Sequence, residues 1–159
     1  MTDLIDRIIK REGGDKETND PKDAGGRTKY GISERAHPEV WIDGIVTNEE
    51  ARKIFEAKYI KGPGFNKIKH EALKEQLVDY GVLSGPGIAI KALQSLVGAE
   101  TDGILGPDTL AKANAVEPVW LNNQLVSTRV RMIGRIVAKN PSQLKFLNGW
   151  LNRALEFLI

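Results

Sequence analysis

The first 32 residues of the chain contain several carboxylates and glycines, together with Thr28. Glu12 is followed directly by Gly13 and Gly14, and the glycine-rich stretch from Asp23 to Ile32 contains a second acid, a hydroxyl group and a tyrosine. A carboxyl group that keeps its proton near neutral pH can protonate the leaving oxygen of a glycosidic bond, while a second group supplies negative charge or activates water. These residues therefore have the chemistry that cleavage of a glycosidic bond needs.

Glu12 is the candidate general acid. The apolar residues between positions 4 and 9 fall on one face of a predicted helix that Gly13 stops, so Glu12 is expected at its C-terminal end. The negative end of the helix dipole disfavours a charged carboxylate there, and partial burial has the same effect. The alternative is that Glu12 is a solvated acid at the helix end, or that it pairs with Arg11 or Arg27.

Asp20 and Asp23 compete for the role of the second acid. Thr28 offers a hydroxyl group that can hold a water molecule beside a carboxylate. Turn formation explains both aspartates equally well, because an Asp side chain can bond the backbone two residues further on. Gly25 and Gly26 permit positive φ or the close approach of a ligand, so both are candidate substrate contacts.

Aromatic residues are candidates for contact with a sugar ring. Tyr30 and Tyr59 are the two that we expect in a substrate cleft. Trp41, Trp120 and Trp150 also have flat faces that suit sugars, but the place of Trp150 among leucines at helical spacing favours the core for this residue.

Other catalytic chemistries find no support in the sequence. The chain has no cysteine, which excludes a thiolate nucleophile, a disulfide and a cysteine-bound metal. His37 and His70 have no neighbours at metal-ligand spacing, so both are interpreted as surface or packing residues. No serine sits in a nucleophile elbow. We therefore expect no metal site and no organic cofactor.

Helical patterns alternate with glycine and proline breaks along the chain. Thr47 and Glu50 have the spacing of a capping box, and Pro107 and Pro118 suit the first turns of two helices. Residues 13–33 contain five glycines and predict a long loop or an irregular β-hairpin. The predicted helices cover residues 3–12, 47–61, 70–82 and 88–96, a segment from Pro107, residues 118–138, and a last helix with a leucine stripe from Leu144 to Leu158. The expected fold class is mainly α, with a small glycine-rich loop or β-hairpin.

The bulk composition indicates a compact globular protein. The chain has 159 residues, of which 41% are hydrophobic and 28% charged, and its net charge is +2. These values exclude a disordered or membrane protein, and no nucleic-acid motif accompanies the small positive charge. We expect one unit of two lobes, a catalytic lobe over residues 1–70 and a helical lobe over residues 71–159, with a cleft between them. No signal peptide or membrane anchor is recognisable, so synthesis in a cytosol is expected.

Several separated motifs occur in a characteristic order over nearly the whole chain. They are Glu12-Gly13-Gly14, Asn19-Asp20-Pro21, Asp23 with Gly25-Gly26 and Thr28, Gly31-Ile32, Tyr59, Ser84-Gly85-Pro86-Gly87, the series Leu93-Gln94, Asp102-Gly103, Gly106-Pro107 and Thr109, and Gly149 to Arg153. In this order they resemble glycoside hydrolase family 108, the phage endolysins that act as peptidoglycan muramidases and carry a C-terminal predicted peptidoglycan-binding region.

The resemblance implies a lysozyme-like, bilobal helical fold that hydrolyses the β-1,4 bond between N-acetylmuramic acid and N-acetylglucosamine in peptidoglycan. Glu12 matches the family's catalytic acid. By similarity, Asp23 and Thr28 would position the attacking water, with Asp20 as the competitor of Asp23. Asp79 and Tyr80, on a predicted helix before the Ser-Gly-Pro motif, are candidate substrate contacts, and a buried core or capping role is equally open for both.

Peptidoglycan is the expected partner, and nucleic acid is not. Without an export signal, the enzyme would need a membrane lesion of the kind that a holin makes to reach the wall. We expect a monomer. Two other functions stay open, namely a non-catalytic peptidoglycan-binding or phage structural module, and a lytic transglycosylase, which uses a single acid and forms an anhydro sugar.

Overall fold

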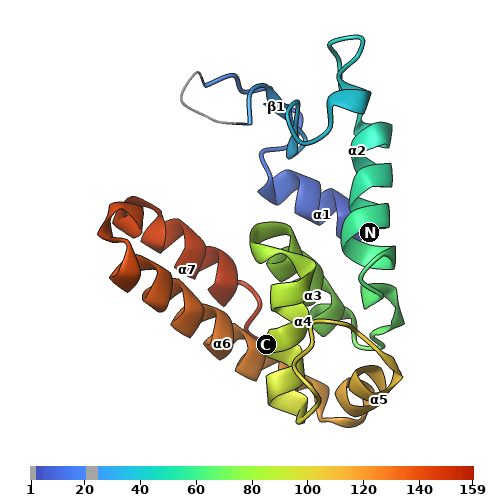
Figure 1. Cartoon of the computed structure of the whole chain (residues 1–159), viewed down its shortest axis with the longest axis vertical. Coiled ribbons are helices and arrows are strands. Elements are labelled where there is room, and N and C mark those ends of the chain that lie inside the picture. The colour runs from blue at the N-terminus through green and yellow to red at the C-terminus, as the bar shows by residue number, and fades with distance from the viewer. Residues whose placement is uncertain (1–2, 21–24) are drawn as a thin grey trace. The chain divides into compact units, whose positions relative to one another are not determined.

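The computed structural model describes residues 3–20 and 25–159 and is mainly helical (Figure 1). The described residues form seven α-helices, four short helical segments of other types (η1–η4) and one small antiparallel sheet of two strands. This confirms the expected fold class. The chain divides into two compact units, Met1–Gly62 and Pro63–Ile159, and each is described by itself below. The lobes expected at residues 1–70 and 71–159 stay a prediction.

The first unit begins with helix α1 (Leu4–Arg11), which buries Ile5, Ile8 and Ile9 on one face. Asp3 occupies the N-cap position, but its side chain makes no capping hydrogen bond. It forms an ion pair with Arg52, which also pairs with Asp6 of α1. Arg52 belongs to α2 (Asn48–Phe55), so these pairs tie the two helices together.

Helix α2 begins with the predicted capping box. The Thr47 hydroxyl accepts the backbone N–H of Glu50 at 3.2 Å, and the Glu50 carboxylate accepts the backbone N–H of Thr47 at 2.9 Å. The helix continues as the π-helical segment η2 (Glu56–Lys61), where the Gly62 N–H donates to the Ala57 carbonyl at 2.9 Å. The helical prediction up to residue 61 is thus confirmed, with a wider last turn.

A small β-hairpin lies between these helices in the sequence. Strand β1 (Thr28–Lys29) pairs with β2 (Ile32–Ser33), and Thr18 adds an isolated bridge to Thr28. The 3-10 segment η1 (Pro38–Val40) follows the hairpin. Of the loop and the hairpin left open by the sequence, the described residues therefore form a hairpin.

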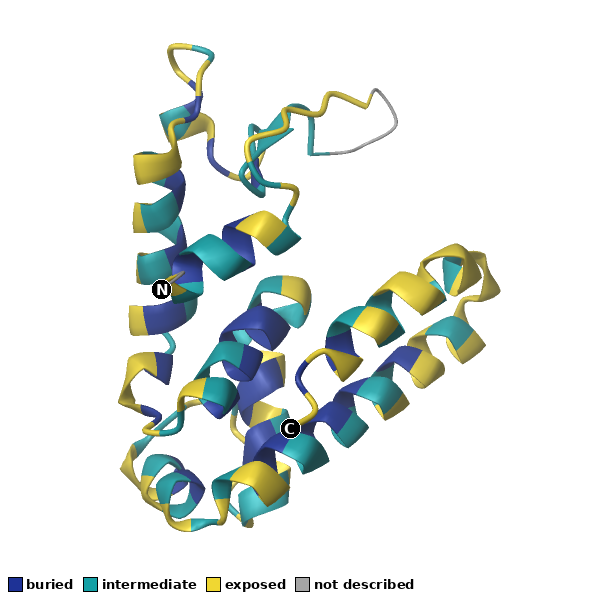
Figure 2. Ribbon diagram, turned by 180° about the vertical axis from the view of Figure 1, so that it is seen from behind, coloured by how far each residue is buried: buried dark blue, intermediate teal, exposed yellow. Residues whose placement is uncertain are grey.

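The second unit is built from helices that proline and glycine separate. After the short 3-10 segment η3 (Phe65–Lys67), its first four helices are α3 (Glu71–Ser84), α4 (Pro86–Val97), α5 (Pro107–Ala115) and α6 (Pro118–Lys139). The last three begin at a proline, whose missing N–H costs nothing in the first helical turn. Figure 2 shows the buried faces of these helices turned toward one another, and the core they enclose includes Leu73, Leu77, Leu93, Leu121 and Leu125.

A buried amide fixes the turn between α4 and α5. The Gln94 amide nitrogen donates to Asp102 Oδ1 at 2.7 Å and to the Thr109 hydroxyl at 3.1 Å, and its oxygen accepts the Gly103 N–H at 2.9 Å. The Gln94 bond is the largest cause that holds the pKa of Asp102 below its usual value, and the Ile104 N–H, which donates to the same carboxylate at 2.8 Å, is the next. The motif from Leu93 to Thr109 is thus a helix-turn-helix connection inside this unit.

The end of the chain differs from its prediction. Residues Pro141–Phe146 form the 3-10 segment η4, and the last helix, α7, covers only Leu147–Leu155. Leu144, Leu155 and Leu158 are exposed, and the buried residues here are Ala154 and Phe157. The continuous leucine stripe was wrong because the 3-10 turns after Pro141 change the angular spacing of the side chains. Helix α7 lies along α6 (Figure 1).

None of the helices among the described residues combines the length and the apolar character that crossing a membrane would need.

Candidate active site

Glu12 is the C-cap residue of α1, as the sequence predicted. Its backbone N–H donates to the carbonyls of Ile8 and Ile9 at 3.0 and 3.1 Å, which fixes the start of its side chain relative to the helix. The residue is half-buried. The Gly14 N–H then donates to the Ile9 carbonyl at 2.9 Å, and both Gly13 and Gly14 have positive φ. The glycine pair therefore turns the chain away and leaves the carboxyl group at the negative end of the helix dipole.

The hairpin turn lies directly against Glu12. Tyr30 and Gly31 form a two-residue turn with φ values of 53° and 78°, which is the pattern of a type I′ turn. The Tyr30 N–H donates to the Gly14 carbonyl at 3.0 Å. A Cβ atom added at Gly31 would lie 2.7 Å from Glu12 Cβ and 3.2 Å from Phe55 Cζ. Only glycine therefore lets the tip of the hairpin approach the glutamate this closely.

Tyr59 stands within electrostatic reach of Glu12. Burial raises the pKa of the Tyr59 phenol, and the charge of Glu12 raises it further. The Tyr59 ring packs against Phe55, with ring centroids 5.7 Å apart and planes tilted by 39°. The end of α2 and the π-helical segment thus place two aromatic rings beside the candidate acid, and one of them carries a hydroxyl group.

Thr28 is held by the sheet through its backbone. Its N–H and its carbonyl both bond to Thr18, at 2.8 and 2.9 Å. Thr28 pairs with Ser33, whereas Lys29 pairs with the buried Ile32. Because successive side chains of a strand point to opposite faces, the Thr28 hydroxyl lies on the face opposite Ile32. Its predicted water-positioning role stays a prediction.

Of the two candidates for the second acid, Asp20 and Asp23, the structure describes only Asp20. Asp23 lies outside the described residues. Asp20 is described and exposed. The choice between them therefore stays as the sequence left it.

Gly25 and Gly26 lead into an ion pair that braces the hairpin. The Gly25 carbonyl accepts the Arg35 N–H at 3.1 Å, and Gly26 has a φ of 72°. Arg27 donates to both oxygens of Glu34, from Nε at 3.2 Å and from Nη2 at 3.1 Å. This contact lowers the pKa of Glu34. Substrate contact by the two glycines stays a prediction.

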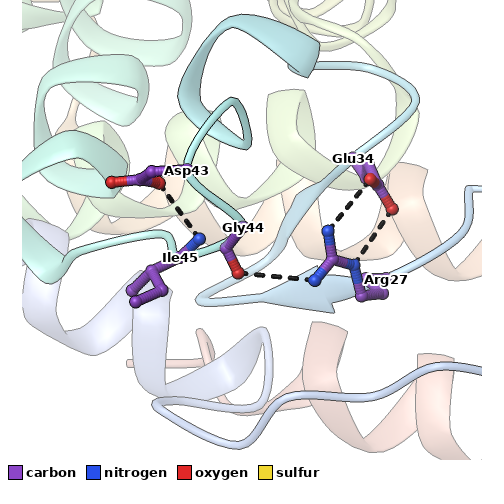
Figure 3. Close-up of polar contacts among 5 residues, drawn as sticks. All are labelled: Arg27, Glu34, Asp43, Gly44 and Ile45. Atoms are coloured by element: carbon purple, nitrogen blue, oxygen red, sulfur yellow. Dashed lines mark hydrogen bonds and ion pairs between the residues drawn. The ribbon is translucent and has the colours of Figure 1, made fainter.

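Arg27 also reaches beyond the hairpin, as Figure 3 shows. Its Nη1 donates to the Gly44 carbonyl at 3.4 Å, and its guanidinium lies 4.7 Å from the centroid of the buried Trp41 ring. Beside Gly44, the Asp43 carboxylate accepts the Ile45 N–H at 3.1 Å. Trp41 is therefore a core residue that Arg27 covers, so its face is not an open sugar platform.

Asp79 and Tyr80 lie in the interior of the second unit. Asp79 is fully buried and accepts hydrogen bonds from Arg129 Nη2 and Arg153 Nη2, both at 2.8 Å. Tyr80 is also buried, and its hydroxyl donates to Met132 Sδ at 3.1 Å. For both residues, these contacts match the core role that the sequence had left open beside substrate contact.

Both histidines have structural contacts. His37 is buried, and its Nδ1 lies 3.2 Å from a Glu39 oxygen. His70 caps α3, where its Nδ1 accepts the Leu73 N–H at 3.4 Å. Among residues 3–20 and 25–159, no group of three or more His, Cys, Asp or Glu side chains could hold a metal ion.

Sequence reasoning missed two residues at this site, Gly31 and Phe55. Gly31 was noted only as part of a motif, and Phe55 was covered only by the predicted helix over residues 47–61. The Tyr-Gly pair between two short β segments was the available signal, because a two-residue turn of this type needs positive φ at both positions.

Comparisons with known proteins give a consistent result. Residues 5–85 match the family model described as Glycosyl hydrolase 108, and residues 88–155 match the one described as Predicted Peptidoglycan domain. Eleven chains of solved structures match. One is from the structure of Brucella abortus SagA, with 25% sequence identity, coverage of 95% of this chain and 91% of that chain, and a TM-score of 0.70. The comparison with curated proteins found no match.

Proposed function

Because the chain belongs to the glycosyl hydrolase 108 family, and is thus a glycoside hydrolase of peptidoglycan, we propose that it cleaves the β-1,4 bond between N-acetylmuramic acid and N-acetylglucosamine. Glu12 is the proton donor in this proposal. The observation that carries it is the contact between Glu12 and the Gly31 turn, with Tyr59 within electrostatic reach of the carboxylate. This arrangement fixes one acid beside aromatic and glycine-rich surfaces that suit a sugar.

The proposed reaction needs two proton transfers. Glu12 donates its proton to the glycosidic oxygen as the bond from the anomeric carbon to that oxygen breaks. A water molecule held by Thr28 and Asp23 attacks the same carbon, and its proton passes to the Asp23 carboxylate. For such a direct displacement, the two carboxyl groups should lie about 6.5–9.5 Å apart, which leaves room for the water. The residues require neither a metal nor an organic cofactor for these steps.

The decisive experiment compares the products of the wild-type chain and a Glu12→Gln variant on purified peptidoglycan. Glutamine keeps the shape of the side chain but has no transferable proton, so we expect turnover to fall by about 10²- to 10⁴-fold, with little change in thermal stability. Glu49→Gln is the matched control, because Glu49 is an exposed acid of α2 whose carboxylate pairs with Lys53. Near-normal turnover of Glu12→Gln would refute the assignment.

Mass spectrometry of the released muropeptides identifies the reaction. Hydrolysis leaves reducing ends that have gained one water, with N-acetylmuramic acid at the new reducing end. Anhydro products would instead indicate a lytic transglycosylase. Sedimentation of the protein with walls, without new reducing ends, would indicate a binding module.

We also propose that the enzyme acts as a phage-type endolysin, made in the host cytoplasm and admitted to the wall by a membrane lesion. The support is the resemblance of the sequence motifs to the phage members of the family. Expression of the chain in bacterial cells should cause lysis only when a holin is expressed with it. Rapid lysis by the chain alone would contradict the requirement for a lesion.

A further inference from the structure

A small groove opens within the second unit, between helices α3, α6 and α7. Its volume is about 110 Å³. The walls are mainly apolar, with Leu83 from α3, Ile133 and Ile136 from α6, and Trp150 from α7. The groove thus suits a short aliphatic group, and it is too small for a sugar chain.

A cationic side chain forms part of the groove lining. Arg129 is only 2% exposed, and its Nη2 donates to Asp79 Oδ2 at 2.8 Å. The other Asp79 oxygen accepts hydrogen bonds from Arg153. Arg129 therefore shares the Asp79 carboxylate with a second guanidinium group.

The remaining terminal nitrogen of Arg129 lacks a partner. Nη1 is buried and makes no hydrogen bond to any of the described residues. The guanidinium carbon lies 5.0 Å from the centroid of the Tyr80 ring, which also lines the groove. A buried N–H donor without an acceptor has lost its hydrogen bond to water and gained none in return, so such a group favours a ligand that supplies the acceptor.

From this combination we infer that the groove binds a carboxylate attached to a small aliphatic group, namely the C-terminal D-alanine of a peptidoglycan peptide. The ligand's carboxylate accepts a charge-assisted hydrogen bond from Nη1. It also brings a second negative charge to Arg129, which shares the Asp79 carboxylate with Arg153. The alanine methyl group contacts the apolar walls. A neutral carbonyl would supply the acceptor without the charge.

The wall peptide is favoured over the C-terminus of an ordinary protein because four of the lining residues named above, Arg129, Ile133, Ile136 and Trp150, lie within the segment that matches the Predicted Peptidoglycan domain. This inference rests on the proposed function for its choice of ligand source. It adds a second contact with the substrate, made to the peptide part of peptidoglycan.

The test is a titration of the ¹⁵N-labelled full chain with N-acetyl-D-alanyl-D-alanine, followed by NMR. We expect saturable shifts of the Trp150 indole N–H and of the Arg129 side chain, with a Kd in the millimolar range, as is typical of a ligand of this size. The C-terminal amide of the same dipeptide should bind at least tenfold more weakly. Equal binding of the amide, or no saturable shift up to tens of millimolar, would overturn the proposal.

Two further comparisons test whether the ligand comes from a wall peptide and whether it binds in this groove. The L,L-dipeptide should bind more weakly than the D,D form, and equal binding would overturn the assignment to wall peptides. Ile136→Asp places a carboxylate on the partly exposed rim, where Ile136 is 38% exposed, and should weaken binding at least tenfold by charge repulsion. Ile136→Asn is the neutral control, and Val119→Asp is the charged control at the other end of α6. Equal losses in all three variants would overturn the site.

Arg129→Lys is the direct variant, since lysine keeps a cation for Asp79 but has no second guanidinium nitrogen. If this variant fails to fold, the comparison of Ile136→Asp with Ile136→Asn still decides whether the dipeptide binds in the groove. The two proposals can fail separately. The dipeptide has no glycosidic bond, so its binding should be unchanged in Glu12→Gln. The rate of glycan hydrolysis tests the role of Glu12, and dipeptide binding tests the groove.

Discussion

The pKa of the Tyr59 phenol responds to the charge of Glu12. Burial and the negative charge of Glu12 both disfavour the phenolate, so the Tyr59 pKa is raised above its ordinary value of 10.0. Replacing Glu12 by glutamine removes the charge and leaves the burial. We therefore predict that Glu12→Gln lowers the Tyr59 pKa while keeping it above 10, as measured from the Cζ chemical shift of ¹³C-labelled tyrosine between pH 8 and 12.

The same titration of Glu49→Gln serves as the control for a general change in charge. Glu49 pairs with Lys53 on α2 and is not among the causes of the Tyr59 shift. The Tyr59 pKa should be the same in this variant and in the wild type. A lower Tyr59 pKa in both Glu12→Gln and Glu49→Gln would show that Tyr59 is not specifically coupled to Glu12.

What the sequence could predict at this scale depends on local signals. Glu12 was placed correctly at the end of α1 because a glycine pair follows an apolar helical pattern. Its proximity to Gly31 and its electrostatic interaction with Tyr59 involve segments 19 and 47 positions further along the chain, and no local pattern specifies such interactions. Asp79 was open between cleft and core because its two arginine partners lie 50 and 74 positions away.

At the scale of elements, the hairpin turn positions the candidate acid. A Cβ atom at Gly31 would overlap with Glu12 Cβ, so we predict that Gly31→Ala displaces Glu12 or the turn and lowers glycan hydrolysis by at least tenfold. The rate of release of reducing ends measures the loss of hydrolysis, and thermal unfolding measures the loss of stability separately.

Gly44→Ala is the matched control for backbone strain. Gly44 has the same φ of 78°, but an added Cβ would lie 3.7 Å from the nearest atom, Arg27 Nη1, which is ordinary contact. Both variants should lose about 1–3 kcal/mol of stability from the left-handed conformation. Only Gly31→Ala should also lose activity beyond its loss of stability, and equal activities would contradict a positioning role for the turn.

Elements were predictable wherever their ends carry strong local signals. The capping box at Thr47 and the prolines at positions 107 and 118 gave correct helix starts. The last helix was predicted too long, because leucines at positions 144 and 158 fit a helical period although the backbone there is 3-10 or non-helical. Periodicity alone does not separate such turns from an α-helix.

At the scale of the whole molecule, the second unit depends on a buried ion cluster. Asp79 joins α3 to Arg129 of α6 and Arg153 of α7. Removing this carboxylate leaves a buried guanidinium without its counter-charge, so we predict that Asp79→Ala lowers the free energy of unfolding by about 3–5 kcal/mol in a denaturant titration. Asp79→Asn should recover only part of this loss, because an amide keeps the shape without the charge.

Asp108→Ala is the control for this prediction. Asp108 is exposed and pairs with Lys112 one turn along α5, so its loss should change stability little. A similarly small effect for Asp79→Ala would contradict the role of the cluster in holding α3, α6 and α7 together.

The mainly helical class was predictable from the order of helical patterns and breaks. How the helices pack was not, because the ion cluster and the groove beside it combine side chains from three separate helices. The order of the motifs carried the family resemblance, which the match over residues 5–85 confirms.

Tyr30 occupies a left-handed backbone position, with a φ of 53°, that asparagine or glycine adopts at lower cost. Anyone engineering a heat-tolerant version of this enzyme would therefore find Tyr30→Asn an obvious first choice. That gain in heat tolerance would remove the aromatic ring of Tyr30, a predicted sugar contact, from the turn that lies against Glu12, so a screen for melting temperature alone would discard this ring.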